Sequence, residues 1–138
     1  MKELMYLLRA MQIYSHNAHH LIKGNSFFGD HEFFGDVYLK LEDDFDSVAE
    51  RIIGLFGEEP LNLQVMMVEV TKRLANCPST GVIDIKDFFS YQLKLELSLC
   101  DLVRQILMKN VTPGTEQLIG EICNQSEIRQ YKLKQRLK

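Results

Sequence analysis

Long helix-forming stretches, interrupted by only three prolines, most constrain what this chain can fold into. The prolines stand at positions 60, 78 and 113 of 138 residues. The sequence between them is rich in Leu, Ile, Met, Lys, Glu and Gln, all of which favour helices. Apolar residues recur there at the helical period. The pattern predicts four long helices and one short one, over about 2–23, 28–56, 62–75, 85–110 and 112 to near the C-terminus.

The order of these segments predicts an all-α fold. Four long amphipathic helices, with a short one between the second and the third, make a four-helix bundle. The long link between the second and third helices lets them run parallel, as in bundles with one crossover. The composition, 46% hydrophobic and 25% charged, is that of an ordinary globular chain, so we expect a single domain over 1–138. Thr112 and Pro113 suit the N-cap and first position of the last helix.

The bulk properties argue against several classes of protein. No apolar run reaches the roughly 18–20 residues that a membrane span needs, and the start lacks the cleavage site of a signal peptide. A net charge of −3 does not suggest a nucleic-acid binder, although the end, IRQYKLKQRLK, is basic. The three cysteines, Cys77, Cys100 and Cys123, form no close pair in the sequence. We therefore expect free thiols and a reducing, cytoplasmic compartment.

Four residues carry the strongest functional signal: His19, His31, Asp46 and Glu50. Imidazole and carboxylate together suit borderline metals such as iron, zinc and manganese. His19 and His31 each lie about 60° from the core direction of their helix, at the edge of its buried face. Asp46 and Glu50 share one helical ridge, about 120° and 160° from that direction. A lone histidine at such an edge is more often a satisfied edge residue, and acids on a flank more often form a solvated face.

One copy of the second helix cannot bring His31 and Asp46 to the same ion. They are 15 residues apart, about 22 Å along a helix. Two copies that cross antiparallel about a two-fold axis can do so. A di-iron site inside the bundle is excluded in its usual form, because all four histidines precede residue 32 and that site needs Glu-x-x-His patterns from both halves. The flank is therefore either a solvated face or a subunit interface that carries a metal site.

The stretch from His19 to Gly57 resembles the signature of the Dps family, the mini-ferritins. The matching elements are His19, Lys23-Gly24, Phe27, His31-Glu32, and Asp46 with Glu50-Arg51. The resemblance implies a ferritin-like bundle that assembles into a hollow dodecamer with ferroxidase sites at its two-fold interfaces. It implies that each site takes two histidines from one subunit and two carboxylates from its partner. The implied activity is oxidation of Fe(II), preferably by hydrogen peroxide rather than dioxygen, and storage of ferric mineral.

Three departures from the family pattern bear on this expectation. The family has an Asp four residues after the second His, where this chain has Gly35, and the acid here is Asp36. Asp36 points about 100° away, so only a local bulge would bring it to the site. The family's Trp after the first His is His20, which could add a ligand. The family's lysine-rich N-terminal tail is missing, so we expect DNA binding to be weak or absent, with the basic C-terminus as a second route.

The leading hypothesis is an iron-oxidising, iron-storing mini-ferritin that detoxifies Fe(II) and hydrogen peroxide under oxidative stress. Its metal ligands are predicted to be His19, His31, Asp46 and Glu50, with Asp36 as a further candidate, around one or two irons; zinc is another candidate ion. The first alternative, which Gly35 favours, is a cage of the same kind that binds a single metal without efficient turnover. The second is a DNA-protecting nucleoid protein, which rests on the basic C-terminus alone.

Overall fold

The computed structural model describes all residues, 1–138, and contains only helices and connections. Five α-helices and one short 3-10 helix follow one another in the order α1 (Lys2–Leu21), α2 (Phe27–Phe56), η1 (Glu59–Leu61), α3 (Leu63–Arg73), α4 (Lys86–Leu107) and α5 (Pro113–Arg136). The all-α prediction is confirmed. Each predicted helix is present, with ends that differ from the expected ones by a few residues at most.

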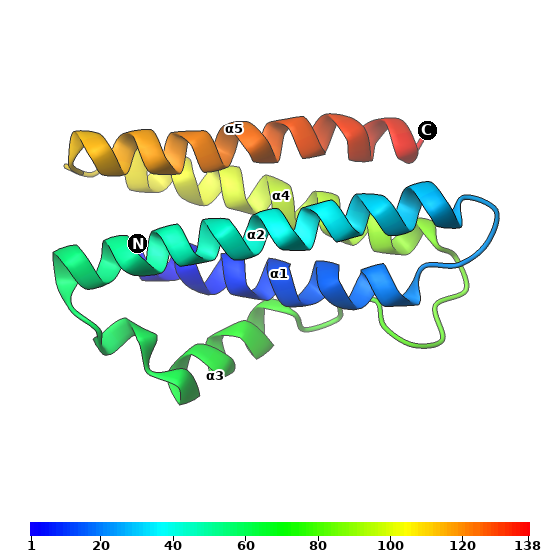
Figure 1. The fold of residues 1–138 in the computed structure, drawn as a ribbon, viewed down its shortest axis with the longest axis horizontal. Helices are drawn as coiled ribbons and strands as arrows, with labels where there is room; N and C mark the ends of the chain where they lie inside the picture. Colours follow the sequence, from blue (N-terminus) through cyan, green and yellow to red (C-terminus); the bar gives the residue numbers. More distant parts are fainter.

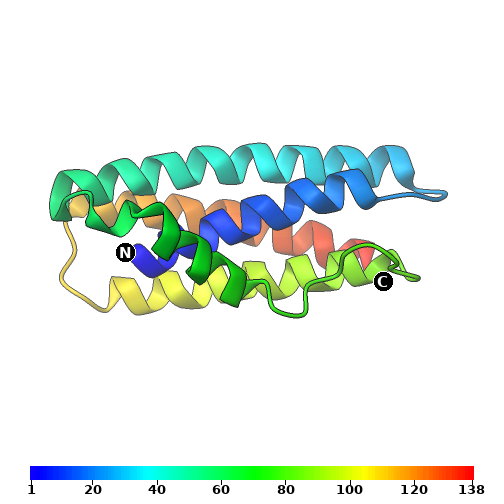
Figure 2. The ribbon, with the colours of Figure 1, turned by 90° about the horizontal axis from the view of Figure 1, so that it is seen from below.

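The four long helices form two antiparallel pairs, α1 with α2 and α4 with α5 (Figure 1). The helices α2 and α4 run in the same direction, because the chain crosses the length of the bundle between them (Figure 1). The helix α3 belongs to this crossover and packs against α1 on one side of the bundle (Figure 2). The predicted four-helix bundle with one crossover is thereby confirmed.

The core is built mainly from the faces that the helical period predicts. Leu4, Leu8 and Met11 of α1 are fully buried, and so are Phe34 and Leu41 of α2. The helix α1 is the most deeply packed, since α2, α3 and α4 all contact it. Burial of one such side chain contributes about 1.5–3 kcal/mol.

Two positions on α2 differ from the expected pattern. The helical period of the sequence places Leu55 in the core stripe of α2, yet this side chain is 46% exposed, because it lies in the last turn of the helix. The same period places Ala49 on the flank beside Asp46 and Glu50, yet Ala49 is buried. The buried arc of α2 is wider than one stripe because this helix contacts both α1 and α5.

Local chemistry explains where the helices begin and end. The Thr112 hydroxyl accepts a hydrogen bond from the Thr115 amide at 3.2 Å, and Pro113 is the first residue of α5, as predicted. Gly57, with φ of 92°, ends α2, and Gly24, with φ of 98°, lies in the turn after α1. Both angles are in the region that favours glycine. None of the helices is both long and apolar enough to span a membrane.

Candidate metal centre

His19 and His31 form a reciprocal pair where α1 turns back into α2. Nδ1 of His19 lies 2.6 Å from the main-chain oxygen of His31, and Nδ1 of His31 lies 2.7 Å from the main-chain oxygen of His19. The rings stack with their centroids 3.6 Å apart. A carbonyl oxygen only accepts, so each Nδ1 must donate. We call this arrangement the histidine clasp.

The clasp leaves a ligand atom free on each ring. With the proton on Nδ1, a neutral imidazole keeps its lone pair on Nε2, and neither Nε2 takes part in a hydrogen bond within the chain. Both side chains are half-buried, so these atoms are sheltered but not sealed. Metal-binding histidines are commonly held in this way, with the other ring nitrogen donating to a main-chain carbonyl. The clasp therefore offers two imidazole nitrogens that a metal ion could bind.

The turn between the helices builds the clasp. Residues 22–26 separate α1 from α2, and Gly24 supplies the positive φ that so short a turn needs. The last turn of α1 then lies against the first turns of α2. The Phe27 ring stacks on His31 with centroids 4.8 Å apart, which helps to fix the imidazole plane.

Gly35 makes room for the His19 ring. A Cβ atom at position 35 would lie 3.1 Å from Cε1 and 3.3 Å from Nδ1 of His19, closer than side chains normally approach. Asp36 does not take the place of a residue at 35, because α2 is regular through this region and has no bulge. Asp36 lies instead in the groove between α2 and α5, beside Lys40 and Arg129. The structure thus does not bring Asp36 to the clasp.

His16 and His20 lie beside the clasp, on the side that faces solvent. The His16 ring stacks on Tyr38 with centroids 4.1 Å apart, and the centroid of His20 lies 5.1 Å from that of His19. Both side chains are exposed. The His20 ring is therefore a direct neighbour of the His19 ring of the clasp.

Asp46 and Glu50 lie on the exposed flank of α2, away from the clasp. Neither carboxylate has an ion-pair partner within the chain. The helix is unbroken from Phe27 to Phe56, so the separation between His31 and Asp46 is about 22 Å. Glu50 also borders an open surface hollow of about 490 Å³ beside Arg51 and Leu118. Within one chain the structure brings the two histidines together and leaves the two carboxylates apart from them.

The interior of the bundle holds an ion pair rather than a set of free ligands. Glu96 of α4 accepts from Arg129 of α5 at 2.7 and 3.0 Å. The Ser126 hydroxyl and the Gln92 amide donate to the same carboxylate at 2.6 and 2.8 Å. Glu96 is fully buried, and these contacts use its oxygen atoms. The Glu96 carboxylate is therefore engaged by donors of the chain itself.

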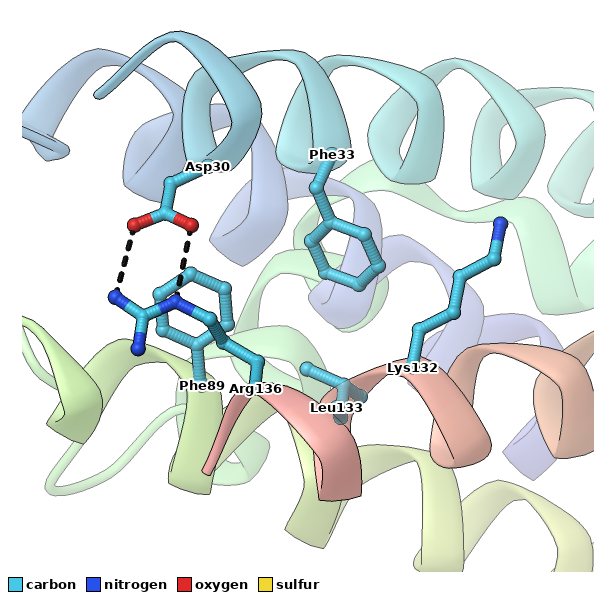
Figure 3. Close-up of a pocket in the computed structure, with 6 residues that line it drawn as sticks. All are labelled: Asp30, Phe33, Phe89, Lys132, Leu133 and Arg136. Atoms are coloured by element: carbon cyan, nitrogen blue, oxygen red, sulfur yellow. Dashed lines mark hydrogen bonds and ion pairs between the residues drawn. The ribbon is translucent and has the colours of Figure 1, made fainter. Parts of the chain in front are cut away.

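A small cavity between α2 and α5 likewise offers no unpaired carboxylate to a metal ion. It measures about 130 Å³, and Phe33, Phe89 and Leu133 supply its apolar wall. Asp30 and Arg136 close one side through two hydrogen bonds of 3.1 Å (Figure 3). The only carboxylate at this cavity is thus engaged by a guanidinium, which ties the C-terminal end of α5 to α2.

One pair of cysteines is close in the fold, although the spacing in the sequence does not indicate it. Cys100 of α4 and Cys123 of α5 have no sequence proximity, yet their sulfur atoms lie 2.8 Å apart. Because α4 and α5 are antiparallel, residues that lie a similar number of positions before and after Val111 contact each other. Cys100 with Cys123 is one such pair, and Glu96 with Arg129 is another. All three thiols are free, as predicted.

Comparison with known proteins settles the architecture. No protein-family model matches the sequence, and no curated protein sequence matches it. Among solved structures the chain is similar to Dps92 from Deinococcus radiodurans, with a TM-score of 0.77 and 23% sequence identity over 96% of this chain and 80% of that chain. This chain has a Dps-like, ferritin-type fold. In the Dps-like fold of this chain, the clasp and the Asp46–Glu50 ridge both lie outside the bundle core.

Proposed function

We propose that this protein is a mini-ferritin that oxidises Fe(II) and stores the ferric product. The observation that carries the proposal is the histidine clasp, which fixes two imidazoles through their Nδ1 atoms and leaves both Nε2 atoms free. The Dps-like fold and the spacing of His19, His31, Asp46 and Glu50 support it. Fe(II) is the substrate in this proposal, and the oxidant is hydrogen peroxide or dioxygen.

The proposed site is shared between two subunits. His19 and His31 would bind Fe(II) through Nε2, and the partner subunit's Asp46 and the partner subunit's Glu50 would complete the ligand set. Neutral imidazoles suit Fe(II), and the carboxylates stabilise the higher charge of Fe(III). When two Fe(II) ions give one electron each to one peroxide molecule, two protons are consumed and two water molecules form. Removing the electrons beside two anionic ligands favours the oxidised product.

Exposed apolar residues support an assembly through α2 and α3. Leu39 and Ile53, which flank the Asp46–Glu50 ridge, are 53% and 46% exposed. Leu63, Val65 and Val68 of α3 are also more than half exposed. An interface between subunits would bury such exposed apolar side chains. We propose a cytoplasmic homo-oligomer, a dodecamer with its sites at two-fold interfaces.

Mixing two inactive variants tests both the ligands and the sharing of the site. We expect His31→Ala and Glu50→Ala each to abolish the fast phase of ferric absorbance when peroxide follows anaerobic Fe(II). Co-assembled in equal amounts, they should regain about a quarter of the wild-type sites. About half of two-fold interfaces are then mixed, and each mixed interface has one intact site of two. His16→Ala, which changes an exposed histidine outside the clasp, is the matched control.

The outcomes separate the proposal from its alternatives. Loss of activity in each variant without recovery in the mixture would place the ligands within one chain and contradict the shared site. Unchanged activity in both variants would remove these residues from the reaction. The second candidate is a cage that binds one metal without turnover, favoured by the packing of His19 against Gly35. Tight binding of one ion per subunit, with no peroxide-driven oxidation, would support that candidate instead.

A further inference from the structure

Cys100, Cys123 and Glu127 bring three ligand atoms together between α4 and α5. The two sulfur atoms are 2.8 Å apart, and one ligand atom from each residue lies within 4.8 Å of the other two. Ligands at tetrahedral zinc distances stand about 3.5–3.8 Å from one another. A small rotation of the side chains would therefore open the right space for one ion.

The helices set this geometry. Cys123 and Glu127 are four residues apart, so they lie on one ridge of α5. Cys100 faces them from α4, and the Gln130 amide donates to its sulfur at 3.3 Å. This hydrogen bond helps to hold the Cys100 side chain in place, as supporting groups do at metal sites. The three ligand residues are thus held from two helices, with a supporting hydrogen bond already in place.

Burial is graded across the cluster, which gives an ion a way in. Cys100 is buried, Cys123 is half-buried and Glu127 is exposed. An ion could enter from the side of Glu127 and keep a water molecule as its fourth ligand. The cluster lies on different helices from the clasp, so it does not depend on the proposed iron chemistry.

The chemistry of the ligands selects the type of ion. Burial, and then the hydrogen bond with Cys100, raises the pKa of Cys123 to about 12. Binding must therefore displace the proton of the Cys123 thiol, and the metal–sulfur bonds must offset that cost. Ions that prefer oxygen, such as Mg²⁺, form no such bonds, whereas Zn²⁺ does.

We propose that Cys100, Cys123 and Glu127 bind one thiophilic divalent cation, of which Zn²⁺ is the type, as a second metal site. Two thiolates, one carboxylate and one water molecule would make up its coordination. The site joins α4 to α5 near the middle of both helices.

Co²⁺ is a suitable spectroscopic probe, because thiolate ligation produces a sulfur-to-cobalt charge-transfer band that histidine and carboxylate ligands do not. With the reduced full-length protein under anaerobic conditions, we expect this band at one Co²⁺ per chain and its loss when Zn²⁺ is added. Cys100→Ser and Cys123→Ser should each abolish it. Glu127→Gln should weaken Co²⁺ binding by at least about 10–100-fold, because loss of a ligand costs no less than loss of a group that supports one.

Matched controls keep the test independent of the clasp and of folding. Cys77→Ser removes the thiol that lies outside the cluster, and His31→Ala removes a clasp ligand, so both should keep the band. Circular dichroism checks each variant, and Cys123→Ser, at a half-buried position, is the least disruptive. Absence of the band in the reduced wild type would overturn the proposal. So would a band that survives Cys123→Ser, or a reduced Cys100–Cys123 pair that Zn²⁺ does not protect from alkylation.

Discussion

Two polar clusters of this bundle, one in each helix pair, use their side chains in opposite ways. Between α4 and α5, Glu96 is fully buried, and Arg129, Ser126 and Gln92 all bond to its carboxylate. Between α1 and α2, each histidine of the clasp spends one ring nitrogen on the main chain and keeps the other free. The first arrangement engages both oxygen atoms of the Glu96 carboxylate, whereas the second leaves the two Nε2 atoms free. The free imidazole nitrogens therefore distinguish the histidine clasp from the Glu96 ion pair.

The largest effect is expected from Arg129→Met, because it leaves the Glu96 carboxylate buried without its counter-charge. Breaking one partner of a buried pair costs about 3–5 kcal/mol. Urea unfolding monitored by circular dichroism measures the loss. The double variant Glu96→Met, Arg129→Met should recover most of it, because the uncompensated charge is gone. Equal stability of the single and double variants would contradict a structural role for the pair.

Gly35→Ala tests the other helix pair. The new Cβ would lie 3.1 Å from Cε1 of His19, so the ring must shift. Overpacking of this kind costs about 1–3 kcal/mol, partly offset by the 0.5–1 kcal/mol that alanine gains over glycine in a helix. A displaced His19 should also weaken Fe(II) binding about 10–100-fold, which calorimetry under anaerobic conditions measures.

Gly29→Ala on the same helix is the matched control for Gly35→Ala. No atom lies within 4 Å of a Cβ built at Gly29. We expect this variant to gain about 0.5–1 kcal/mol and to bind Fe(II) as the wild type does. If both variants behaved alike in stability and in Fe(II) binding, the packing of His19 against position 35 would have no functional consequence.

Most of the fold could be predicted from the sequence, because helical periodicity, capping and chain length act locally. Thr112, Pro113 and the core faces of α1 and α4 are found in the structure as expected. The failures lie where a second helix decides the environment. Ala49 is buried because α2 contacts α5 as well as α1, and Cys100 meets Cys123 because α4 and α5 are antiparallel.

The candidate site could be predicted only in part, for a related reason. Spacing identifies His19 and His31 as candidate ligands. Their pairing depends on the turn between the helices, which brings the Nδ1 atom of each ring to the main-chain oxygen of the other residue. The reason for Gly35 likewise becomes visible only when the His19 ring is in place. The joining of the histidines to Asp46 and Glu50 depends on a second subunit and stays a prediction.

Asp44→Asn probes the contact between the two helix pairs and should have the smallest effect. Asp44 is buried on α2, pairs with Lys40 at 2.9 Å and has one oxygen, Oδ2, without a partner. Burial raises the pKa of Asp44 above its ordinary value of 3.8, and Lys40 only partly opposes this. A raised pKa in the folded state means that the protonated carboxyl favours folding. This contribution is complete below about pH 3.8 and is lost as the pH rises through the folded-state pKa.

The Asp44→Asn variant, which cannot ionise, should therefore become more stable relative to the wild type as the pH rises from 4 to 7. The gain is roughly 0.5 kcal/mol, because the ion pair with Lys40 already offsets part of the cost of burying the ionised carboxylate. Urea midpoints across this range measure it, with the exposed Asp43→Asn as the control. If the difference in stability between Asp44→Asn and the wild type did not change with pH, Asp44 would be as well solvated as a surface carboxylate. Its unpartnered oxygen would then have no effect on the stability of the contact between the helix pairs.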